Sequence, residues 1–268
     1  MLKTALSAVA SSSRATRSEM AIFLQLDAVS LSYPEQSHVV RDVNLHVNKG
    51  EIHCLIGRSG CGKTSLLKVA AGLLRPQQGA VHLNGIALQA PRPEMGFVFQ
   101  APTLLDWLDV SDNLLLPVSL HRTVTVADRR HAAQLLEQLG LKNIARSKVS
   151  GLSGGQQSRV AIARALILKP SMLFMDEPFA ALDAITRDEL QRDFLKLCLA
   201  FGTSVLFVTH DISEAVYLGH RVSCMRAGEI NASYDVNLPT PRQPTLRYSP
   251  PFNALCERLR ATMDGAQC

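Results

Sequence analysis

Alternating and continuous apolar segments follow one another along the chain from residue 21 onward. Segments 23–26 (FLQL) and 43–47 (VNLHV) alternate apolar with polar side chains, which is the pattern of half-buried strands. Segment 52–56 (IHCLI) is almost continuously apolar, as expected of a central parallel strand that is covered on both faces. Further strands are expected at 80–83, 96–99, 172–175, 204–208 and 221–225.

Helices are expected between these strands. The predicted helices cover 63–73, 128–139, 155–168, 184–199 and 212–218. Strands and helices therefore alternate, and this order predicts an α/β core with a small antiparallel β subdomain near its beginning. The stretch from about 100 to 150 has no strand pattern, so we expect a helical subdomain at about 100–160.

The two ends of the chain depart from this alternation. Residues 1–20 have no apolar period and are expected to form a disordered extension; a secretory signal and an organelle transit peptide are the alternatives. After a domain expected at 21–232, the segment 233–268 is rich in proline, which excludes a regular domain there. We expect a tail with a short helix at 252–263, either packed on the body or regulatory.

Composition and charge narrow the class of protein. With 268 residues, of which 47% are hydrophobic and 19% charged, the chain can bury a sizeable core. The net charge of +5 falls to +2 once the acid-free residues 1–18 are set aside, so no nucleic-acid partner is expected. No apolar run reaches the length of about 18 residues that a membrane-spanning helix needs. The six cysteines form no CxxC pair, which argues for free thiols rather than a zinc site.

A glycine-rich loop follows segment 52–56 directly and precedes a predicted helix. It reads G-x-x-x-x-G-K-T, and its glycines let backbone N–H groups turn toward phosphate oxygens at a helix N-terminus. We expect Lys63 on the β- and γ-phosphates and the Thr64 hydroxyl on Mg²⁺. The predicted nucleoside-triphosphate site comprises Gly57, Arg58, Ser59, Gly60, Cys61, Gly62, Lys63, Thr64 and Ser65.

A pair of carboxylates ends the apolar segment 172–175. Asp176 is expected to hold Mg²⁺ beside the phosphate loop, directly or through water. Glu177 is one residue further on and is placed to polarise an attacking water as a general base. Such a pair can also serve only as acids at a helix N-terminus, but the phosphate loop upstream favours the catalytic interpretation.

A second anion-binding device precedes the helix expected at 155–168. It consists of Ser153, Gly154, Gly155 and Gln156, where a serine N-cap with two glycines behind it exposes backbone donors. With this motif the sequence resembles the ATP-binding-cassette ATPases over about residues 22–230. The resemblance implies a P-loop NTPase (RecA-like) core and a head-to-tail homodimer, in which the signature of one protomer closes over ATP on the partner's phosphate loop.

The resemblance also assigns four single residues. Gln100 matches the loop glutamine that senses Mg²⁺ and water, and Asp183 matches the aspartate that contacts the opposite protomer. His210 matches the switch histidine on the γ-phosphate, and Tyr33 matches the aromatic that stacks on adenine. For Tyr33 the alternative of an ordinary strand aromatic stays open.

Two further segments indicate the branch of the family. Residues 103–110 and 178–187 resemble the ATPases of nitrate, sulfonate and taurine importers, although Asp106 stands where that branch usually has proline. The resemblance implies a peripheral subunit on the cytoplasmic face of the inner membrane, bound to two transmembrane permease subunits and served by an extracytoplasmic solute-binding protein. Trp107 is either core of the helical subdomain or a contact for a permease. A soluble non-transport cassette ATPase is the alternative function, and the transported solute is not encoded in this chain.

Overall fold

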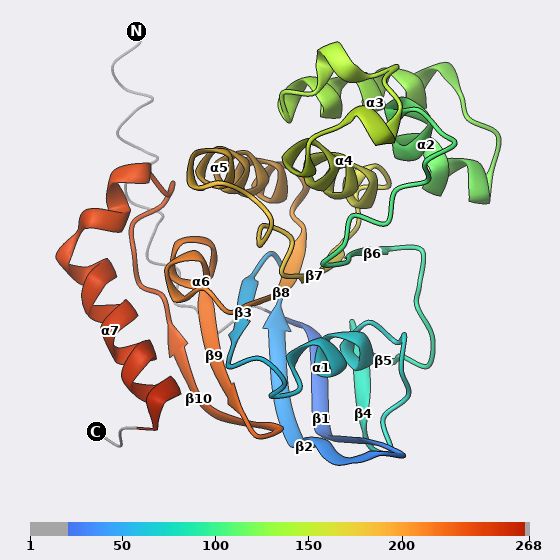
Figure 1. Ribbon diagram of the computed structural model, residues 1–268. Helices are drawn as coiled ribbons and strands as arrows, with labels where there is room; N and C mark the ends of the chain where they lie inside the picture. Colours follow the sequence, from blue (N-terminus) through green and yellow to red (C-terminus); the bar gives the residue numbers. More distant parts are fainter. Residues whose placement is uncertain (1–20, 266–268) are drawn as a thin grey trace, which may run out of the picture.

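A six-stranded sheet forms the centre of the molecule in this computed structural model, which describes residues 21–265. Its strand order is β10-β9-β3-β8-β7-β6, and a second sheet of four strands has the order β2-β1-β4-β5. Figure 1 shows the second sheet and helix α1 at one end of the molecule and helices α2 to α5 gathered at the other. The predicted extension 1–20 lies outside the described residues.

The central sheet contains the parallel strands that the apolar segments predict. These are β3 (Ile52–Ile56), β6 (Met95–Val98), β7 (Met172–Asp176), β8 (Ser204–Thr209) and β9 (Arg221–Arg226). All residues of β3, β7 and β8 are buried, because structure covers both faces of the sheet. Leu55 packs in the cluster shared with the antiparallel sheet, whereas Cys54 and Ile56 pack in the cluster shared with the helices. The predicted α/β fold class is confirmed.

Strand β10 (Glu229–Asp235) is an element that the sequence pattern did not predict. It pairs antiparallel with β9, so that Glu229 lies opposite Arg226 across a two-residue turn. The turn residues Ala227 and Gly228 both have positive φ (50° and 87°), and this conformation matches the twist of a hairpin. The strand's side chains are exposed or half-buried and carry no apolar run. The domain boundary expected between 232 and 233 falls inside this paired strand.

The antiparallel sheet has longer strands than the alternating segments indicate. It consists of β1 (Ile22–Tyr33), β2 (Gln36–Asn48), β4 (Gln78–Leu83) and β5 (Ile86–Ala87). Register shifts interrupt the pairing of β1 with β2 on both sides of Val29, and Ala28 and Asp42 have positive φ (49° and 43°). Each bulge moves the following side chains to the other face, so the period-two pattern stops while the strand continues.

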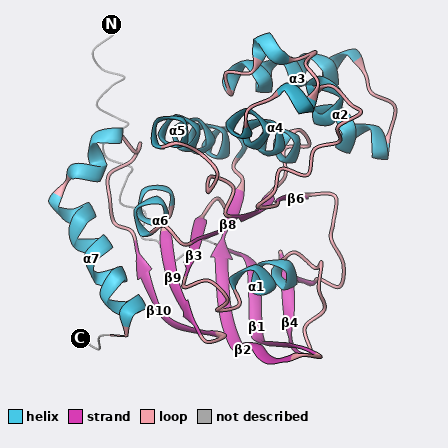
Figure 2. Cartoon of the chain, in the orientation of Figure 1, coloured by secondary structure: helices cyan, strands magenta, loops and turns pink. Residues whose placement is uncertain are grey.

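Helices connect most of the strands of the central sheet, as the sequence pattern predicts (Figure 2). They are α1 (Lys63–Ala70), α2 (Val110–His121), α3 (Val126–Gln138), α4 (Gly154–Leu166), α5 (Ala184–Phe201) and α6 (Ile212–Leu218). Helix α1 ends three residues before the predicted end at 73, and Gly72 with φ 71° turns the chain away. In the helical subdomain, Leu114 and Leu115 are buried and belong to the main core.

The proline-rich segment packs on the body of the protein. It contains the 3₁₀ helix η4 (Pro244–Tyr248) and helix α7 (Pro250–Asp264), which confirms the predicted C-terminal helix. Prolines occupy the first positions of helix α7. They are tolerated there because the backbone N–H groups of the first turn have no partner within the helix. Phe252 and Leu259 are buried against the core. Between residues 21 and 265, no helix is both long and apolar enough to cross a bilayer.

Candidate functional site

The phosphate loop connects the C-terminal end of β3 to the first turn of α1. Gly62 has a φ of 105°, and a Cβ atom there would collide with the carbonyl oxygen of Val39. A Cβ at Gly57 would collide with the carbonyl oxygen of Met225 on β9. The backbone N–H of Gly228 donates to the Cys61 carbonyl at 3.1 Å, so the β9–β10 turn holds the loop from one side. Glycine is therefore required where the loop passes other backbone segments.

Lys63 is buried at the start of α1, with 5% of its surface exposed. Its Nζ donates to the carbonyl oxygens of Gly57 and Arg58, at 2.8 and 3.0 Å. A buried ammonium needs such partners, and these two belong to the phosphate loop itself. The lysine is thus already oriented across the loop, where the phosphates of a nucleotide would offer it more strongly charged oxygens.

Asp176 ends strand β7 next to the first turn of α1. The Thr64 hydroxyl donates to its Oδ1 at 3.1 Å, so the two residues expected to share a metal ion are in contact. Burial raises the pKa of Asp176, while the bond from Thr64 and the charges of Lys68 and Lys63 oppose that effect. A hydroxyl and a carboxylate are oxygen donors of the kind that Mg²⁺ prefers, so this pair fits the expected metal.

Glu177 and His210 meet at the same edge of the sheet. Nδ1 of His210 lies 2.9 Å from Oε2 of Glu177, and the imidazole is more exposed than the carboxylate. Glu177 has a φ of 44°, which is uncommon for a residue with a side chain, and its N–H donates to the Val208 carbonyl at 3.0 Å. The neighbouring strand thus holds the Glu177 backbone in a left-handed conformation. The sequence predicted these two residues for the site but not this backbone.

Gln100 lies just beyond the end of β6, which is the edge neighbour of β7. Val98 is paired with Met175, so Gln100 and Asp176 both follow that pair at the carboxyl ends of adjacent parallel strands. Its side chain is exposed. The register therefore brings Gln100 to the edge where the expected magnesium ligands lie.

The signature motif caps helix α4. Ser153 Oγ accepts from the N–H of Gln156, and Gln156 Oε1 accepts from the N–H of Ser153, which forms a capping box. Ser153 and Gly154 are exposed. Among residues 21–265, no hydrogen bond joins this motif to the chain's own phosphate loop. The structure therefore presents the signature to solvent rather than to the nucleotide loop of the same chain.

The loop of Asp183 lies against the signature. A Cβ on Gly155 would come within 3.3 Å of both Leu182 and Thr186. Asp183 is the N-cap of α5 and accepts from the N–H of Thr186 at 3.0 Å, and these bonds lower the pKa of its carboxyl. The signature and the Asp183 loop thus form one continuous, exposed surface of the chain.

Tyr33 ends strand β1 beside the phosphate loop. Its hydroxyl lies 3.2 Å from Oγ of Ser65 in the first turn of α1, and 39% of its surface is exposed. A core residue would expose less of its ring. The contact with Ser65 places a partly free aromatic face beside the phosphate site.

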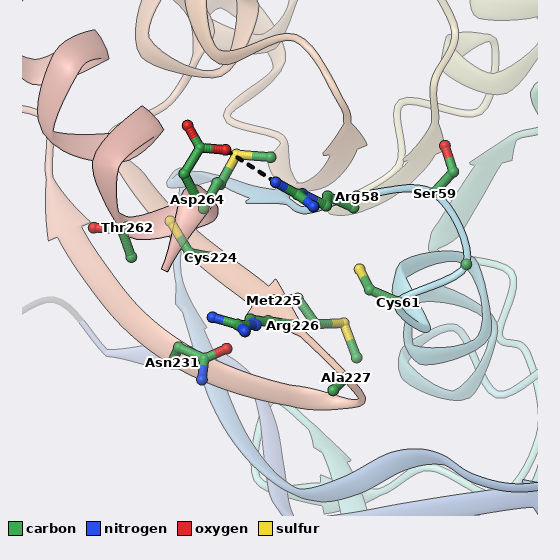
Figure 3. Close-up of a pocket in the computed structure, with 12 residues that line it drawn as sticks. Arg58, Ser59, Cys61, Cys224, Met225, Arg226, Ala227, Asn231, Thr262 and Asp264 are labelled. Atoms are coloured by element: carbon green, nitrogen blue, oxygen red, sulfur yellow. Dashed lines mark hydrogen bonds and ion pairs between the residues drawn. The ribbon is translucent and has the colours of Figure 1, made fainter. Parts of the chain in front are cut away.

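A second feature of the phosphate loop could not be read from the sequence. Arg58 Nη2 forms an ion pair with Asp264 Oδ1 at 3.1 Å, which joins the loop to the last turn of α7. Figure 3 shows this pair at one side of a cavity of about 240 Å³ between the loop, the β9–β10 hairpin and α7. The two residues are 206 positions apart; Arg58 occupies a variable position of the phosphate-loop motif, and Asp264 belongs to no motif that the sequence shows.

Trp107 is 71% exposed, so the interpretation as core packing is wrong. It lies in the turn between Gln100 and α2, and its carbonyl accepts from Lys148 Nζ at 3.2 Å. The neighbouring Leu104 is partly buried against the main core. The indole is therefore an exposed apolar side chain on a turn that also contains partly buried leucines.

Fold and site together define a P-loop nucleotide-binding protein whose phosphate loop, carboxylates and histidine meet at one edge of a parallel sheet. Residues 40–180 match the family model described as ABC transporter. The chain is 41% identical over 207 residues to the taurine import ATP-binding protein of Pelagibacter ubique, which covers 76% of this chain and 77% of the relative. The chain belongs to the ABC transporter family, and it is an ATP-binding subunit that hydrolyses ATP.

Two more comparisons agree with this assignment. The aliphatic sulfonates import ATP-binding protein of Xanthomonas axonopodis pv. citri is 45% identical over 207 residues, covering 76% of this chain and 82% of the relative. The solved dimeric structure of an ATP-binding cassette in a post-hydrolysis state with ADP and phosphate superimposes with a TM-score of 0.73. That structure is 31% identical and covers 80% of this chain and 99% of its own.

Proposed function

We propose that this chain powers the import of small oxyanions of the nitrate, sulfonate and taurine type. The relatives named for taurine and aliphatic sulfonates support this class of substrate. The observation that carries the ATPase assignment to particular residues is the arrangement at one sheet edge. The phosphate loop follows β3, the Glu177–His210 pair spans β7 and β8, and these three strands are neighbours.

Each residue at this edge has a proposed task in hydrolysis. Lys63 leaves the two loop carbonyls and binds the β- and γ-phosphates of ATP, which the glycine backbone N–H groups surround. Glu177 accepts a proton from the attacking water, and His210 holds that carboxylate and contacts the γ-phosphate. Tyr33 stacks on the adenine ring, since its partly exposed face adjoins the loop.

The proposed metal ligands are Thr64, Asp176 and Gln100. When bound there, Mg²⁺ would neutralise charge that develops on the phosphates during transfer. Before metal binding, the Thr64 hydroxyl orients the Asp176 carboxylate by its hydrogen bond. Gln100 lies at the end of the adjacent strand β6, between the proposed metal site and the segment that carries Trp107. It could therefore respond to changes at both places.

We further propose a head-to-tail homodimer. Ser153, Gly154, Gly155 and Gln156 of one protomer would cover ATP on the partner's phosphate loop, with Asp183 beside them. The exposed signature and its contact with the Asp183 loop support this arrangement. The dimer would act as a peripheral subunit at the cytoplasmic face of the inner membrane, on two permease subunits that receive solute from an extracytoplasmic binding protein. The ATPase domain expected at 21–232 would extend to the end of β10 at Asp235, and the rest of the segment 233–268 would be its packed tail.

Transport in a reconstituted system tests the proposed substrate class. The chain would be purified with its permease subunits, placed in liposomes with the solute-binding protein, and supplied with MgATP. We expect ATP-dependent uptake of labelled taurine, an alkanesulfonate or nitrate, and no uptake when the chain carries Glu177→Gln. A complex that hydrolyses ATP but takes up none of the three anions would contradict the proposed substrate class while leaving the ATPase assignment intact.

A further inference from the structure

An arginine in the last turn of the signature helix holds the loop that follows Gln100. Arg164 of α4 is half-buried. Its guanidinium donates to the carbonyl oxygens of Pro102 and Thr103, each at 2.9 Å, and to the hydroxyl oxygen of Thr103 at 3.0 Å. A planar fork of donors can keep several acceptors in one arrangement. Arg164 therefore fixes two consecutive residues of the loop to the helix that begins at the signature.

The end of α4 that carries Arg164 packs directly on strand β6. A Cβ atom on Gly96 of β6 would lie 2.9 Å from the carbonyl oxygen of Ala165, so the backbones of the helix and the strand are in close contact there. Gly96 is paired with Leu173 of β7, which fixes this part of β6 in the sheet. The guanidinium of Arg164 thus extends from a point that is anchored on the strand leading to Gln100.

Gln100 lies between two fixed points of the chain. Before it, Val98 is paired with Met175 in the sheet; after it, Pro102 is bound by Arg164. The Gln100 side chain is exposed and makes no hydrogen bond within residues 21–265. Its place at the nucleotide edge therefore depends on how firmly the two ends of this short segment are held.

Thr103 adopts a backbone conformation that needs such support. Its φ is 48°, and a left-handed conformation is rare for a β-branched residue. Strain of this kind persists only where the surrounding structure maintains it. The bonds from Arg164 to the carbonyl and the hydroxyl of Thr103 supply that restraint. Without them we expect the turn at Thr103 to relax, which would free the segment as far as Leu104, whose side chain packs on the core.

Stability alone explains the position of Arg164 poorly. Burial lowers the pKa of its guanidinium, and no acidic side chain in the described part of the chain offsets that shift. Its bonds go to the loop instead. Arg159, which is also half-buried on α4, pairs with Glu189 at 3.2 Å and donates to the Leu139 carbonyl at 3.1 Å. Arg159 thus joins α4 to other helices without touching the loop, so it offers a matched control.

We propose that Arg164 is a positioning residue for the magnesium site, which fixes the loop after Gln100 so that the Gln100 side chain stays at the edge where Thr64 and Asp176 lie. The inference rests on the proposed role of Gln100 as a magnesium ligand. Arg164 is not itself one of the proposed ligands. Removing its donors should therefore weaken metal binding while every ligand remains in the chain.

Metal binding by the full-length chain tests the proposal. Mn²⁺ serves as the probe and is titrated, with detection by electron paramagnetic resonance, into a Glu177→Gln chain that carries one equivalent of ATP. Arg164→Met keeps an unbranched side chain without the donors. We expect it to raise the dissociation constant of Mn²⁺ by a factor of about 3 to 10, at or below the range for groups that orient metal ligands directly. Arg159→Met should leave that constant unchanged.

Two more variants and a second measurement separate positioning from a structural role. Arg164→Lys keeps the charge but not the fork, so it should raise the constant by less than Arg164→Met does. Thr103→Val removes only the hydroxyl acceptor; it should have a small effect alone and none when Arg164→Met is already present, because the two residues no longer interact. Hydrogen exchange of the backbone amides in 99–104 should become faster in Arg164→Met and not in Arg159→Met.

Gln100→Ala in the same background distinguishes a failure of this inference from a failure of the proposed function. If Gln100→Ala weakens Mn²⁺ binding but Arg164→Met and Arg164→Lys do not, the inference is overturned and the role of Gln100 stands. If Gln100→Ala leaves Mn²⁺ binding unchanged, the proposed role of Gln100 is wrong and the inference falls with it. Equal losses of Mn²⁺ binding and of melting temperature in Arg164→Met and Arg159→Met would show a structural role only, which also overturns the inference.

Discussion

At the scale of single residues, Glu177 combines an unusual backbone with a short contact to His210. Its left-handed conformation costs on the order of 1 kcal/mol or more, which the bond to the Val208 carbonyl and the packing of β7 must offset. The conformation turns the side chain away from the strand direction at the edge where β7 and β8 end. Strain at that point is consistent with a residue that is held for chemistry.

Glu177→Gln should therefore separate ATP binding from hydrolysis. The amide keeps the shape and cannot accept the proton of the attacking water, so turnover should fall at least about 10²-fold while ATP still binds. Phosphate release under saturating MgATP measures the first quantity, and equilibrium binding of a fluorescent ATP analogue measures the second. Hydrolysis within a factor of about two of the unmodified chain would refute Glu177 as the base.

At the scale of elements, the turn between β6 and α2 presents an apolar side chain on a rigid support. Trp107 is exposed, while Asn113 of α2 is fully buried and bonds back to the turn through both backbone groups of Leu105, at 2.9 and 3.1 Å. An exposed indole on an ordered turn is a common anchor of protein interfaces. The turn adjoins Gln100, so a partner bound there would be close to the nucleotide edge.

Trp107→Ala should weaken assembly without affecting ATP chemistry. Truncating an interface anchor costs about 2 kcal/mol or more, so the variant should largely fail to co-purify with the permease subunits. The isolated chain should hydrolyse ATP and melt as before, because the indole packs little against its own fold. Tyr248→Ala is the matched control, since Tyr248 is 83% exposed on η4. Equal loss of assembly in both variants would place the docking surface elsewhere.

At the scale of the whole molecule, one chain carries a phosphate loop and an exposed signature that do not bond to each other. In a head-to-tail dimer each nucleotide would contact the phosphate loop of one protomer and the signature of the other. An isolated protomer would then lack a complete nucleotide site. The solved cassette structure with ADP and phosphate, at 31% identity, is itself dimeric, which supports a dimer of this chain. Mixed dimers can test it directly.

Two inactive variants should restore hydrolysis when mixed. Lys63→Ala removes the phosphate ligand, and Ser153→Arg blocks the signature without touching the phosphate loop. In a head-to-tail dimer of one chain of each kind, one nucleotide site keeps its intact loop and an intact signature, while the other site loses both. We expect ATPase activity to appear on mixing and refolding the two, and each alone to stay inactive. No recovery in mixtures that do dimerise would show that each chain builds its site alone.

Much of the site was predictable because its residues lie in local patterns. The apolar runs at 52–56 and 172–175 were enough to predict two buried strands. The G-x-x-x-x-G-K-T spacing directly after the first run was enough to predict the phosphate loop. Since the carboxyl ends of parallel strands share one edge, the order of strands placed Asp176, Glu177 and His210 beside Lys63. The lengths of β1 and β2 were missed, because bulges at Ala28 and Asp42 interrupt the alternation. Strand β10 was missed, because its stability comes from a hairpin partner rather than from its own apolar run.

The sequence by itself determined the fold class through its buried strands and the family through its motifs, and it predicted the residues of the nucleotide edge. Only the tertiary structure decided how distant segments meet. It brought Asp264 of α7 to Arg58 of the phosphate loop, and Arg247 to the buried residue Gln191, which contacts Glu214. Such contacts depend on the path of the whole chain, because hydrogen bonds and ion pairs act over a few ångströms and leave no trace in the spacing of the residues that form them.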